Sequence, residues 1–336
     1  MSSEDIAVIG AGSYGTCLAV LFGKAGHRVS LYCRSADEAR AIDVARQNVK
    51  YLPGHPLAAS VAVTSDLAEA VRGKRFVFGV TPSHAIREVL GRAAEALDSD
   101  AIVINASKGL EDGTLHTIDE IYREVLPERI ATRATYLSGP TFAGELAAGK
   151  PAAIVLAGGD PDTRAAAQKA LSQNHFRIYT TDDVRGVLIG GALKNVIAIM
   201  AGISDGMGYG SNSRVALITR GLAEITRMGV ALRAQTQTFA GLSGMGDLVL
   251  TCSDDASRNR RVGLALGRGR AMADILAEMT QVAEGVKTAK VAWQLAVKHA
   301  VRAPITEAAY EIMHAGEPVR KVIDALLDRP PRPERD

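Results

Sequence analysis

The sequence predicts an α/β protein in which a doubly wound parallel sheet is followed by an all-helical C-terminal domain. Three observations predict this fold. Strand-like and helical segments alternate over residues 1–185, a glycine-rich turn joins the first strand to the first helix, and strand-like segments stop after about residue 185. Such alternation is typical of parallel sheets with helices on both faces. At 336 residues, the chain is long enough for about two domains.

Short apolar runs mark the expected strands of the first part, and longer segments with helical periodicity lie between them. The expected strands span residues 5–10, 28–33, 61–64, 75–80, 101–106, 135–138, 152–157 and 176–179. The expected helices between them include residues 36–46, 84–97, 115–125 and 161–173. The later helical segments span residues 185–204, 213–229, 257–267, 271–279, 285–299, 305–314 and 318–328.

The chain therefore divides into a sheet domain over residues 1–185 and a helical substrate or catalytic domain over residues 186–328. Ligands of such sheets bind beside the carboxyl ends of the strands, so polar residues that follow strands are candidates for a site. The last residues, 329–336, are rich in proline and charge, which is typical of a disordered tail.

The turn after the first strand carries a dinucleotide-binding fingerprint. Gly10, Gly12 and Gly15 stand between the apolar run at 6–9 and a mostly apolar helix at 16–26. In this pattern the first glycine allows a tight turn, the second lets the backbone approach a pyrophosphate, and the third lets the helix pack closely on the strand. The N-terminus of the helix offers free N–H groups to the phosphates. We therefore expect a Rossmann-type dinucleotide-binding domain.

The end of the second strand indicates which dinucleotide binds. An acidic residue there would bond to a ribose 2′-hydroxyl, but the strand at 28–33 is followed by Arg34. A guanidinium group can pair with a 2′-phosphate and stack on a base. Arg34 therefore predicts NADP(H), with NAD(H) as an additional cofactor. The alternative interpretation of Arg34 is a solvated surface charge.

The composition argues against several other classes of protein. The chain is 47% hydrophobic, so it can bury a large core, and its net charge of +2 does not favour nucleic-acid binding. The three cysteines, Cys17, Cys33 and Cys252, are scattered along the chain, as expected for reduced structural thiols.

The first expected strand begins within six residues of the start, so we expect no signal peptide and a cytoplasmic protein. The apolar segment 186–203 is long enough to resemble a membrane span, but Lys194 lies at its centre, where lipid would disfavour a charge. We therefore expect a buried helix without a membrane span.

Lys194 is the first candidate for chemistry. Its helical neighbours are Gly190, Gly191, Ile197 and Ala198, and none of them can pair with an ammonium group. A buried lysine without a local partner must meet a distant carboxylate or lose its proton more easily. Either environment suits a proton donor or acceptor. The alternative is that the side chain extends to the surface, although two glycines one turn away indicate close packing.

Asp247 is a candidate partner for this lysine. It follows a glycine-rich turn, with Gly241, Gly244 and Gly246 in the six residues before it. Such a turn brings the backbone close to another group, and the aspartate then has either a catalytic role or the role of a helix cap. The spacing alone does not decide between the two.

Further candidates lie at a helix start and at the strand ends. Ser257 is a good N-cap, and the adjacent Arg258 and Asn259 predict a phosphate site, although a solvated basic turn has the same composition. Lys108 follows the strand at 101–106, where it can attract a phosphate or polarise a carbonyl, and the turn at 139–141 offers a hydroxyl at another strand end.

The histidines and cysteines do not support metal or nucleophilic chemistry. The seven histidines have no ligand spacing, no Gly-x-Ser-x-Gly segment is present, and no cysteine stands beside an expected base. We therefore expect no metal site. Hydride transfer requires neither a metal nor a nucleophile, because the cofactor carries the hydride and the protein supplies orientation and a proton.

Six segments in order together resemble the bacterial NAD(P)-dependent sn-glycerol-3-phosphate dehydrogenase family. They are Gly-Ala-Gly-Ser-Tyr-Gly at 10–15, Ser-Lys-Gly at 107–109, Gly-Pro-Thr-Phe-Ala at 139–143, Ala-Leu-Lys-Asn at 192–195, Gly-Met-Gly-Asp-Leu at 244–248 and Ser-Arg-Asn-Arg at 257–260. The resemblance extends from residue 5 to about residue 328. The first segment is common to many dehydrogenases, and the last three are specific to this family.

The resemblance implies reduction of dihydroxyacetone phosphate to sn-glycerol 3-phosphate, a precursor of phospholipids. It implies that Lys194 is the proton donor, that Asp247 is its acidic partner, and that Lys108 touches both cofactor and substrate. The substrate contacts that it implies are Gly139, Thr141, Ser257, Arg258 and Asn259. The cofactor contacts that it implies are Ser13, Tyr14, Arg34, Ala143, Arg258, Val282 and Glu284. It also implies a homodimer.

This sequence departs from the family pattern at two positions. Thr141 stands where serine is common, and Tyr14 stands where tryptophan or phenylalanine is also usual. The hydroxyl and the aromatic ring both remain, so neither change removes the expected activity.

Two other functions are compatible with parts of the sequence. A 2-ketopantoate reductase-like dehydrogenase would share the sheet-plus-helices plan and the lysine, but it would not need the expected phosphate site at residues 257–259. A non-catalytic NADP(H) sensor would keep the glycine turn and Arg34, but it would not need Lys194 and Asp247 together.

Overall fold

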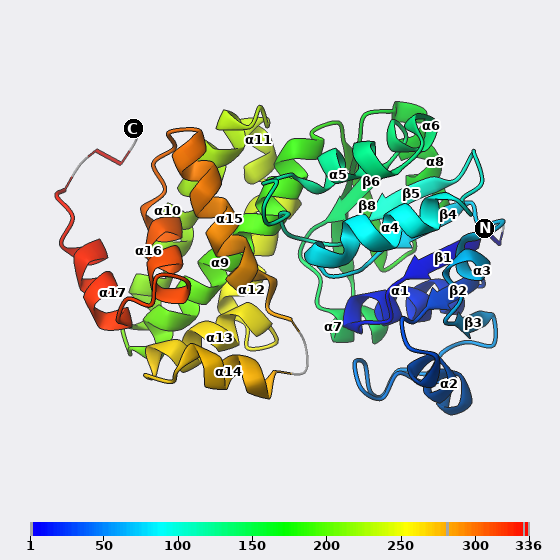
Figure 1. Ribbon diagram of the computed structural model, residues 1–336, viewed down its shortest axis with the longest axis horizontal. Helices are drawn as coiled ribbons and strands as arrows, with labels where there is room; N and C mark the ends of the chain where they lie inside the picture. The colour runs from blue at the N-terminus through cyan, green and yellow to red at the C-terminus, as the bar shows by residue number, and fades with distance from the viewer. Residues whose placement is uncertain (1–2, 280–281, 332, 335–336) are drawn as a thin grey trace.

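The computed structural model describes residues 3–279, 282–331 and 333–334. Two halves lie side by side along its longest axis (Figure 1). Within the described residues, all the strands belong to a sheet half over residues 5–181, and the helices from residue 184 onwards form a helical half. The boundary between these two halves is called the seam below. The division into two domains at residue 185 remains a proposal, which this arrangement supports.

One eight-stranded sheet forms the centre of the sheet half. Its order is β3-β2-β1-β4-β5-β6-β7-β8, and neighbouring strands from β3 to β6 are parallel. The strands are β1 (Asp5–Ile9), β2 (Arg28–Tyr32), β3 (Val61–Thr64), β4 (Phe76–Gly79), β5 (Ile102–Asn105), β6 (Thr135–Ser138), β7 (Ala152–Gly158) and β8 (Phe176–Thr181). All eight expected strands are present. The chain crosses from one side of β1 to the other before β4, so the switch point that binds dinucleotides in such sheets lies between β1 and β4.

The last two strands run against the others. β7 is antiparallel to β6, and β8 is parallel to β7. The sequence indicated the strands but not this reversal, because the apolar pattern of a strand carries no direction. The expected parallel, doubly wound sheet therefore describes β1 to β6.

Helices connect and cover the strands. They are α1 (Ser13–Lys24), α2 (Ala36–Ala45), α3 (Leu67–Val71), the short 3₁₀ turn η1 (Ser83–Ala85), α4 (Ile86–Ala94), α5 (Ile118–Val125), α6 (Glu128–Ala131), α7 (Ala143–Ala147) and α8 (Pro161–Leu171). The sequence did not indicate α3, α6 and α7, which are too short to show a helical repeat. The helix expected from residue 115 begins only at Ile118, because Thr117 and Glu120 form a capping box there.

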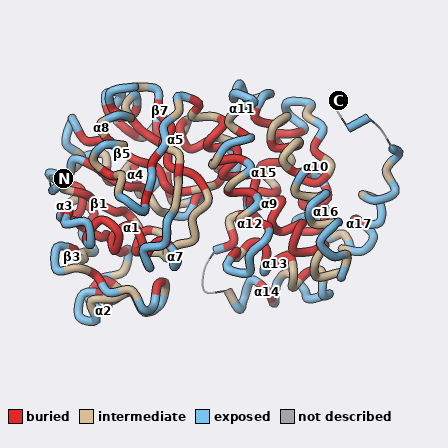
Figure 2. Tube along the Cα trace, turned by 180° about the vertical axis from the view of Figure 1, so that it is seen from behind, coloured by how far each residue is buried: buried red, intermediate tan, exposed pale blue. Residues whose placement is uncertain are grey.

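The helical half is built around one buried helix. α9 (Val184–Gly206) has the length and the mean hydropathy of a membrane span, 1.8, yet its most apolar window is wholly buried inside the protein. Figure 2 shows this helix as a buried core with exposed segments around it. The surrounding helices are α10 (Gly210–Ala231), α11 (Thr236–Phe239), the π-helical turn η2 (Leu242–Gly246), α12 (Asp247–Ser253), α13 (Arg258–Gly267), α14 (Met272–Glu278), α15 (Glu284–Lys298), α16 (Pro304–Met313) and α17 (Val319–Leu327).

Close contact between α9 and α13 depends on glycines. A methyl group at Gly202 would lie 2.1 Å from the carbonyl oxygen of Arg260, and one at Gly263 would lie 1.9 Å from the carbonyl oxygen of Ile199. No side chain fits at such distances, so the two backbones touch. This contact places α13 along the second half of α9, and a hydrogen bond from Asn259 to Asn195 brings the start of α13 next to Lys194.

Cys17, Cys33 and Cys252 are free and buried, and burial raises the pKa of Cys17 and of Cys252 to about 12.

The described residues 329–331 and 333–334 form no helix or strand, and the carbonyl of Glu334 accepts a hydrogen bond from Arg220 at 3.1 Å. Residues 332 and 335–336 of the expected disordered tail lie outside the described residues.

The helix contact predicts that Gly263→Ala destabilises the protein by about 1–3 kcal/mol, because the methyl group must push two backbones apart. Thermal or urea unfolding measures this effect. Gly91→Ala is a matched control in the middle of α4, where the nearest atom to an added methyl group is 3.9 Å away. The control is expected to gain roughly 0.5–1 kcal/mol, and an equal response of the two variants would contradict the role of the contact.

Candidate active site

The glycine turn has the geometry that a dinucleotide requires. Gly10 has a φ of +119°, and a methyl group there would lie 2.7 Å from the carbonyl oxygen of Val80 in the chain after β4. A methyl group at Gly15 would lie 1.9 Å from the carbonyl oxygen of Gly10. At Gly12, by contrast, an added methyl group would meet no atom within 4 Å. The turn is therefore tight on its inner side and open where a pyrophosphate would approach.

The N-terminus of α1 is arranged to receive phosphate groups. Gly12 is the N-cap of this helix and provides no side-chain acceptor, so the first N–H groups of the helix are left for a ligand. Ser13 donates a hydrogen bond to the carbonyl of Tyr51 at 2.7 Å, and Asn48 donates to the carbonyl of Ala11 at 2.8 Å. The segment between α2 and β3 therefore fixes the turn from outside. These residues fit a bound NAD(P).

Arg34 lies at the carboxyl edge of the sheet, two residues after the end of β2. Its side chain is exposed, and it directly precedes Ser35, the N-cap of α2. This position is compatible with a 2′-phosphate beside the second strand. It is equally compatible with a surface charge, so the NADP preference remains a proposal.

Three charged side chains meet at the seam. Lys194 from α9 donates a hydrogen bond to Asp247 Oδ1 at 2.5 Å, and Lys108, which follows β5, donates to Asp247 Oδ2 at 2.5 Å. Lys194 also donates to Thr251 Oγ1 at 2.7 Å. One carboxylate of the helical half thus holds an ammonium group from each half of the molecule.

Burial determines the electrostatics of this cluster. Lys194 is 6% exposed and Asp247 is 1% exposed. Burial lowers the pKa of Lys194 to about 8, although the charge of Asp247 opposes this shift. Burial also disfavours the ionised form of Asp247, but Lys108 and Lys194 outweigh it and hold the pKa of the carboxyl group below its ordinary value. The site therefore contains an ionised carboxylate beside a lysine that can exchange a proton near neutral pH.

Local structure explains how these side chains meet. A methyl group at Gly190 would lie 2.7 Å from the carbonyl oxygen of Ser243 in η2, and one at Gly191 would lie 2.9 Å from Ser138 Oγ. The two glycines thus let the π-helical turn and the end of β6 approach α9. Asp247 is the first residue of α12 and forms no cap, since Gly246 is the N-cap. The capping interpretation of Asp247 is therefore wrong, because its carboxylate is bound to two lysines.

The start of α13 lies beside this cluster. Ser257 is the N-cap and accepts a hydrogen bond from Arg260 N at 3.2 Å. Asn259 donates to Asn195 Oδ1 at 3.0 Å and accepts from Gly285 N at 2.9 Å, so its amide joins α9, α13 and α15. Burial lowers the pKa of the half-buried Arg258, and the nearby charge of Glu284 opposes this effect.

The remaining expected contacts lie around the same edge of the sheet. Thr141 donates a hydrogen bond to the hydroxyl of Tyr14 at 3.3 Å, which joins the glycine turn to the segment after β6. Gly139 has a φ of +147°, and Ala143 begins α7. Val282 is 41% exposed and precedes α15 by two residues.

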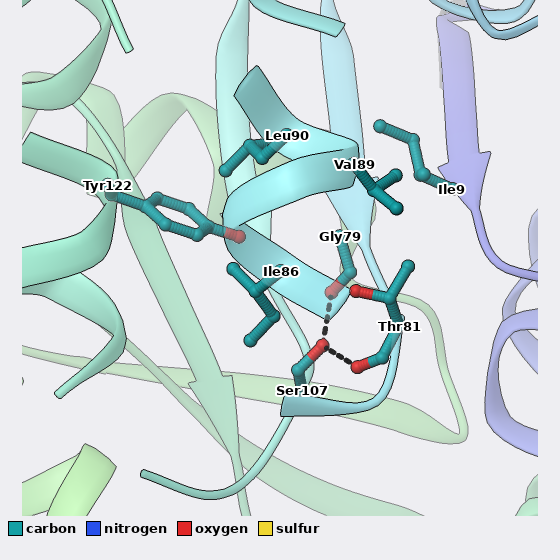
Figure 3. Close-up of a pocket in the computed structure, with 8 residues that line it drawn as sticks. All are labelled: Ile9, Gly79, Thr81, Ile86, Val89, Leu90, Ser107 and Tyr122. Atoms are coloured by element: carbon teal, nitrogen blue, oxygen red, sulfur yellow. Dashed lines mark hydrogen bonds between the residues drawn. The ribbon is translucent and has the colours of Figure 1, made fainter. Parts of the chain in front are cut away.

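A small pocket lies behind this edge, between the end of β4 and helix α4. Figure 3 shows Ser107 donating to the carbonyls of Gly79 and Thr81, at 3.3 and 2.6 Å, while Tyr122 reaches toward Gly79. The pocket is far too small for a substrate. Its hydrogen bonds instead fix the chain after β4 against the chain after β5.

The structure brings the expected catalytic residues together and shows further residues in contact with the site. Lys108, Asp247 and Lys194 form one cluster, while Arg34 and Val282 lie away from its hydrogen bonds. Sequence reasoning missed Thr251 and gave Ser83 no role. Thr251 lies one helical turn after Asp247, a spacing that could have indicated it. Ser83 follows the strand expected at residues 75–80, at the edge of the sheet where ligands bind.

A glycine turn fitted for a dinucleotide, beside a buried lysine–carboxylate cluster, defines the class of dinucleotide-dependent oxidoreductases. Two family models, the N-terminus and the C-terminus of NAD-dependent glycerol-3-phosphate dehydrogenase, match residues 5–164 and 183–324. The chain belongs to this family.

Named relatives extend this result over the whole chain. The protein is 50% identical over 333 residues to glycerol-3-phosphate dehydrogenase [NAD(P)+] of Geobacter sulfurreducens, covering 99% of both chains, and 47% identical over 327 residues to that of Myxococcus xanthus, covering 97% of this chain and 98% of the relative. The crystal structure of glycerol-3-phosphate dehydrogenase from Coxiella burnetii has a TM-score of 0.91 at 35% identity, covering 97% of this chain and 99% of that one. A ketopantoate reductase from Ralstonia eutropha, with a TM-score of 0.60 at 18% identity, covering 96% of this chain and 99% of that one, shares the fold alone.

Proposed function

We propose that this protein is an NAD(P)-dependent glycerol-3-phosphate dehydrogenase that reduces dihydroxyacetone phosphate to sn-glycerol 3-phosphate. The observation that carries the proposal is the cluster in which Lys108 and the buried Lys194 share the buried carboxylate of Asp247. It lies at the seam, where one of its lysines follows β5 at the carboxyl edge of the sheet. A ketone reductase needs a proton donor at this edge.

Lys194 is the proposed proton donor. When bound, the reduced dinucleotide supplies a hydride to the carbonyl carbon, and the carbonyl oxygen then needs a proton. With a pKa of about 8, the buried ammonium group of Lys194 can release a proton near neutral pH. Asp247 orients this ammonium group, and Thr251 fixes it from a second direction. Lys108 provides a second positive charge beside the developing alkoxide.

The start of α13 is the proposed phosphate site. The helix N-terminus favours negative charge, and Ser257, Arg258 and Asn259 add a hydroxyl, a guanidinium and an amide there. One N–H of the Asn259 amide bonds to Asn195, and within the described part of the chain the second N–H is left for a ligand. Gly139 and Thr141 are proposed to contact the substrate from the opposite half of the molecule.

The two other functions account for fewer of these features. A 2-ketopantoate reductase has no substrate phosphate for the start of α13 to bind. A sensor of NADP(H) does not require a buried lysine and a second, half-buried lysine on one buried carboxylate, because burying such charges costs free energy.

The proposal also includes the cofactor preference, the cellular role and the oligomeric state of the protein. NADP(H) preference rests on Arg34, and the product is a precursor for glycerophospholipid synthesis. The proposed cofactor contacts are Gly10, Gly12, Ser13, Tyr14, Gly15, Arg34, Lys108, Ala143, Arg258, Val282 and Glu284. The expected form is a cytoplasmic homodimer. No membrane span is expected, because the most apolar window of α9 is wholly buried inside the protein.

The central test is the loss of absorbance at 340 nm with dihydroxyacetone phosphate and NADPH. Wild-type protein is expected to consume NADPH, and Lys194→Ala is expected to lower kcat by about 10²–10⁴-fold, as other lost proton donors do. Binding of NADPH to the variant serves as the folding control. Near-normal turnover by Lys194→Ala would show that this residue is not the proton donor. Wild-type protein that binds NADPH but does not consume it would show that dihydroxyacetone phosphate is not the substrate.

The burial of Lys194 predicts a characteristic pH dependence. For reduction, kcat/KM is expected to fall as the pH rises through about 8, because the neutral amine has no proton to donate. For oxidation of glycerol 3-phosphate, kcat/KM is expected to rise over the same range, because the neutral amine accepts the proton. Profiles with the same direction in both assays would contradict this role.

Arg34 predicts the choice of cofactor. Wild-type protein is expected to have a lower KM for NADPH than for NADH, and Arg34→Ala is expected to raise the KM for NADPH by about tenfold or more, because a charged hydrogen bond to phosphate is lost. The KM for NADH should change little, which controls for damage to the fold. Equal effects on the two cofactors would mean that Arg34 is a surface charge.

A further inference from the structure

Ser83 and Glu284 form a second link across the seam, apart from the lysine cluster. Ser83 begins η1 after β4, and Glu284 is the first residue of α15 in the helical half. The hydroxyl of Ser83 donates to Glu284 Oε2 at 2.6 Å, and its backbone N–H approaches Oε1 at 3.3 Å. Both oxygens of one carboxylate are thus held by one residue that lies 201 positions away in the chain.

The chain after β5 is shaped around this pair. Gly109 has a φ of +140°, and a methyl group there would lie 2.7 Å from Ser83 Cβ and 3.2 Å from Glu284 Oε2. Only glycine therefore fits between the pair and the backbone. Because Gly109 directly follows Lys108, the pair also borders the segment that carries one lysine of the cluster.

The segment that carries Ser83 is held rigidly from behind. Ser107 donates to the carbonyls of Gly79 and Thr81, as Figure 3 shows, and Ser83 itself is only 4% exposed. A hydrogen-bond donor whose own position is fixed in this way can hold a carboxylate in one orientation.

The location of the pair connects it to the cofactor. β4 is the strand across the switch point from the glycine turn on β1, so the segment after β4 borders the dinucleotide site. Glu284 is also one of the proposed cofactor contacts, and its charge acts on Arg258 at the start of α13.

We propose that Ser83 is a positioning residue whose hydrogen bonds to Glu284 form a latch between the sheet and the helical half. The proposal rests on the proposed function, because it assumes that NADPH binds at this edge. The latch holds the Glu284 carboxylate in place for the cofactor, so removing it weakens NADPH binding before any substrate is present.

The test is a double-mutant cycle on NADPH binding, measured by fluorescence titration without substrate. Ser83→Ala and Glu284→Gln are each expected to raise the Kd about tenfold, the size expected for a hydrogen bond to a charged group. Ser83→Ala is expected to have a much smaller effect in the Glu284→Gln background than in wild type, because the neutral amide no longer accepts a charge-assisted hydrogen bond from Ser83. Additive effects, or wild-type affinity in Ser83→Ala, would overturn the latch.

Two further variants keep the test decisive. Arg34→Ala removes a cofactor contact that is proposed elsewhere on the sheet, after β2, so its effect is expected to multiply with that of Glu284→Gln. If Ser83→Ala does not fold, Ser83→Cys keeps the shape with a weaker donor. Its Kd is expected above that of wild type, and a wild-type Kd would contradict the latch.

Failure of the latch and failure of the proposed function give different results. Wild-type reduction of dihydroxyacetone phosphate with an additive cycle would keep the function and reject the latch. A coupled cycle in a protein that does not reduce this substrate would keep the latch and reject the substrate.

Discussion

The carboxylate of Asp247 is the constraint on which the site depends. It is almost completely buried, and each of its oxygens accepts a hydrogen bond from a lysine, one from each half of the molecule. A buried charge without partners is very unfavourable, so neither Lys194 nor Asp247 could stay ionised alone. The same contact therefore compensates the charges that are buried at the seam and places the proposed proton donor at the carboxyl edge of the sheet.

Close backbone packing makes this arrangement possible. Because Gly190 and Gly191 have no side chains, η2 and the end of β6 can contact α9. Gly202 and Gly263 allow α13 to pack directly against the same helix. Helix α9, which is buried from Gly186 to Ser204, thus contacts Asp247 on one side and the expected phosphate site on another. The glycine turn on β1 faces the same edge because the strand order changes direction beside it.

Much of the fold and part of the site could be predicted from the sequence. Apolar runs located all eight strands, and the glycine pattern located the dinucleotide turn in which Gly10 and Gly15 are tightly packed. The reversal of β7 could not be predicted, because a run of apolar residues has no direction. The Ser83–Glu284 contact joins positions 201 residues apart, and no local pattern reports such a contact. The role of Asp247 could not be predicted either, because tertiary packing determines whether its carboxylate caps a helix or forms ion pairs.

The pH dependence of Asp247→Asn tests the central claim most directly. The charge of Asp247 raises the pKa of Lys194 against the effect of burial, so its removal should lower that pKa. We expect kcat/KM for the reduction of dihydroxyacetone phosphate to fall at a pH clearly below the wild-type value of about 8, with a much lower plateau. An unchanged profile would mean that Asp247 does not control the proton on Lys194, and would contradict the account.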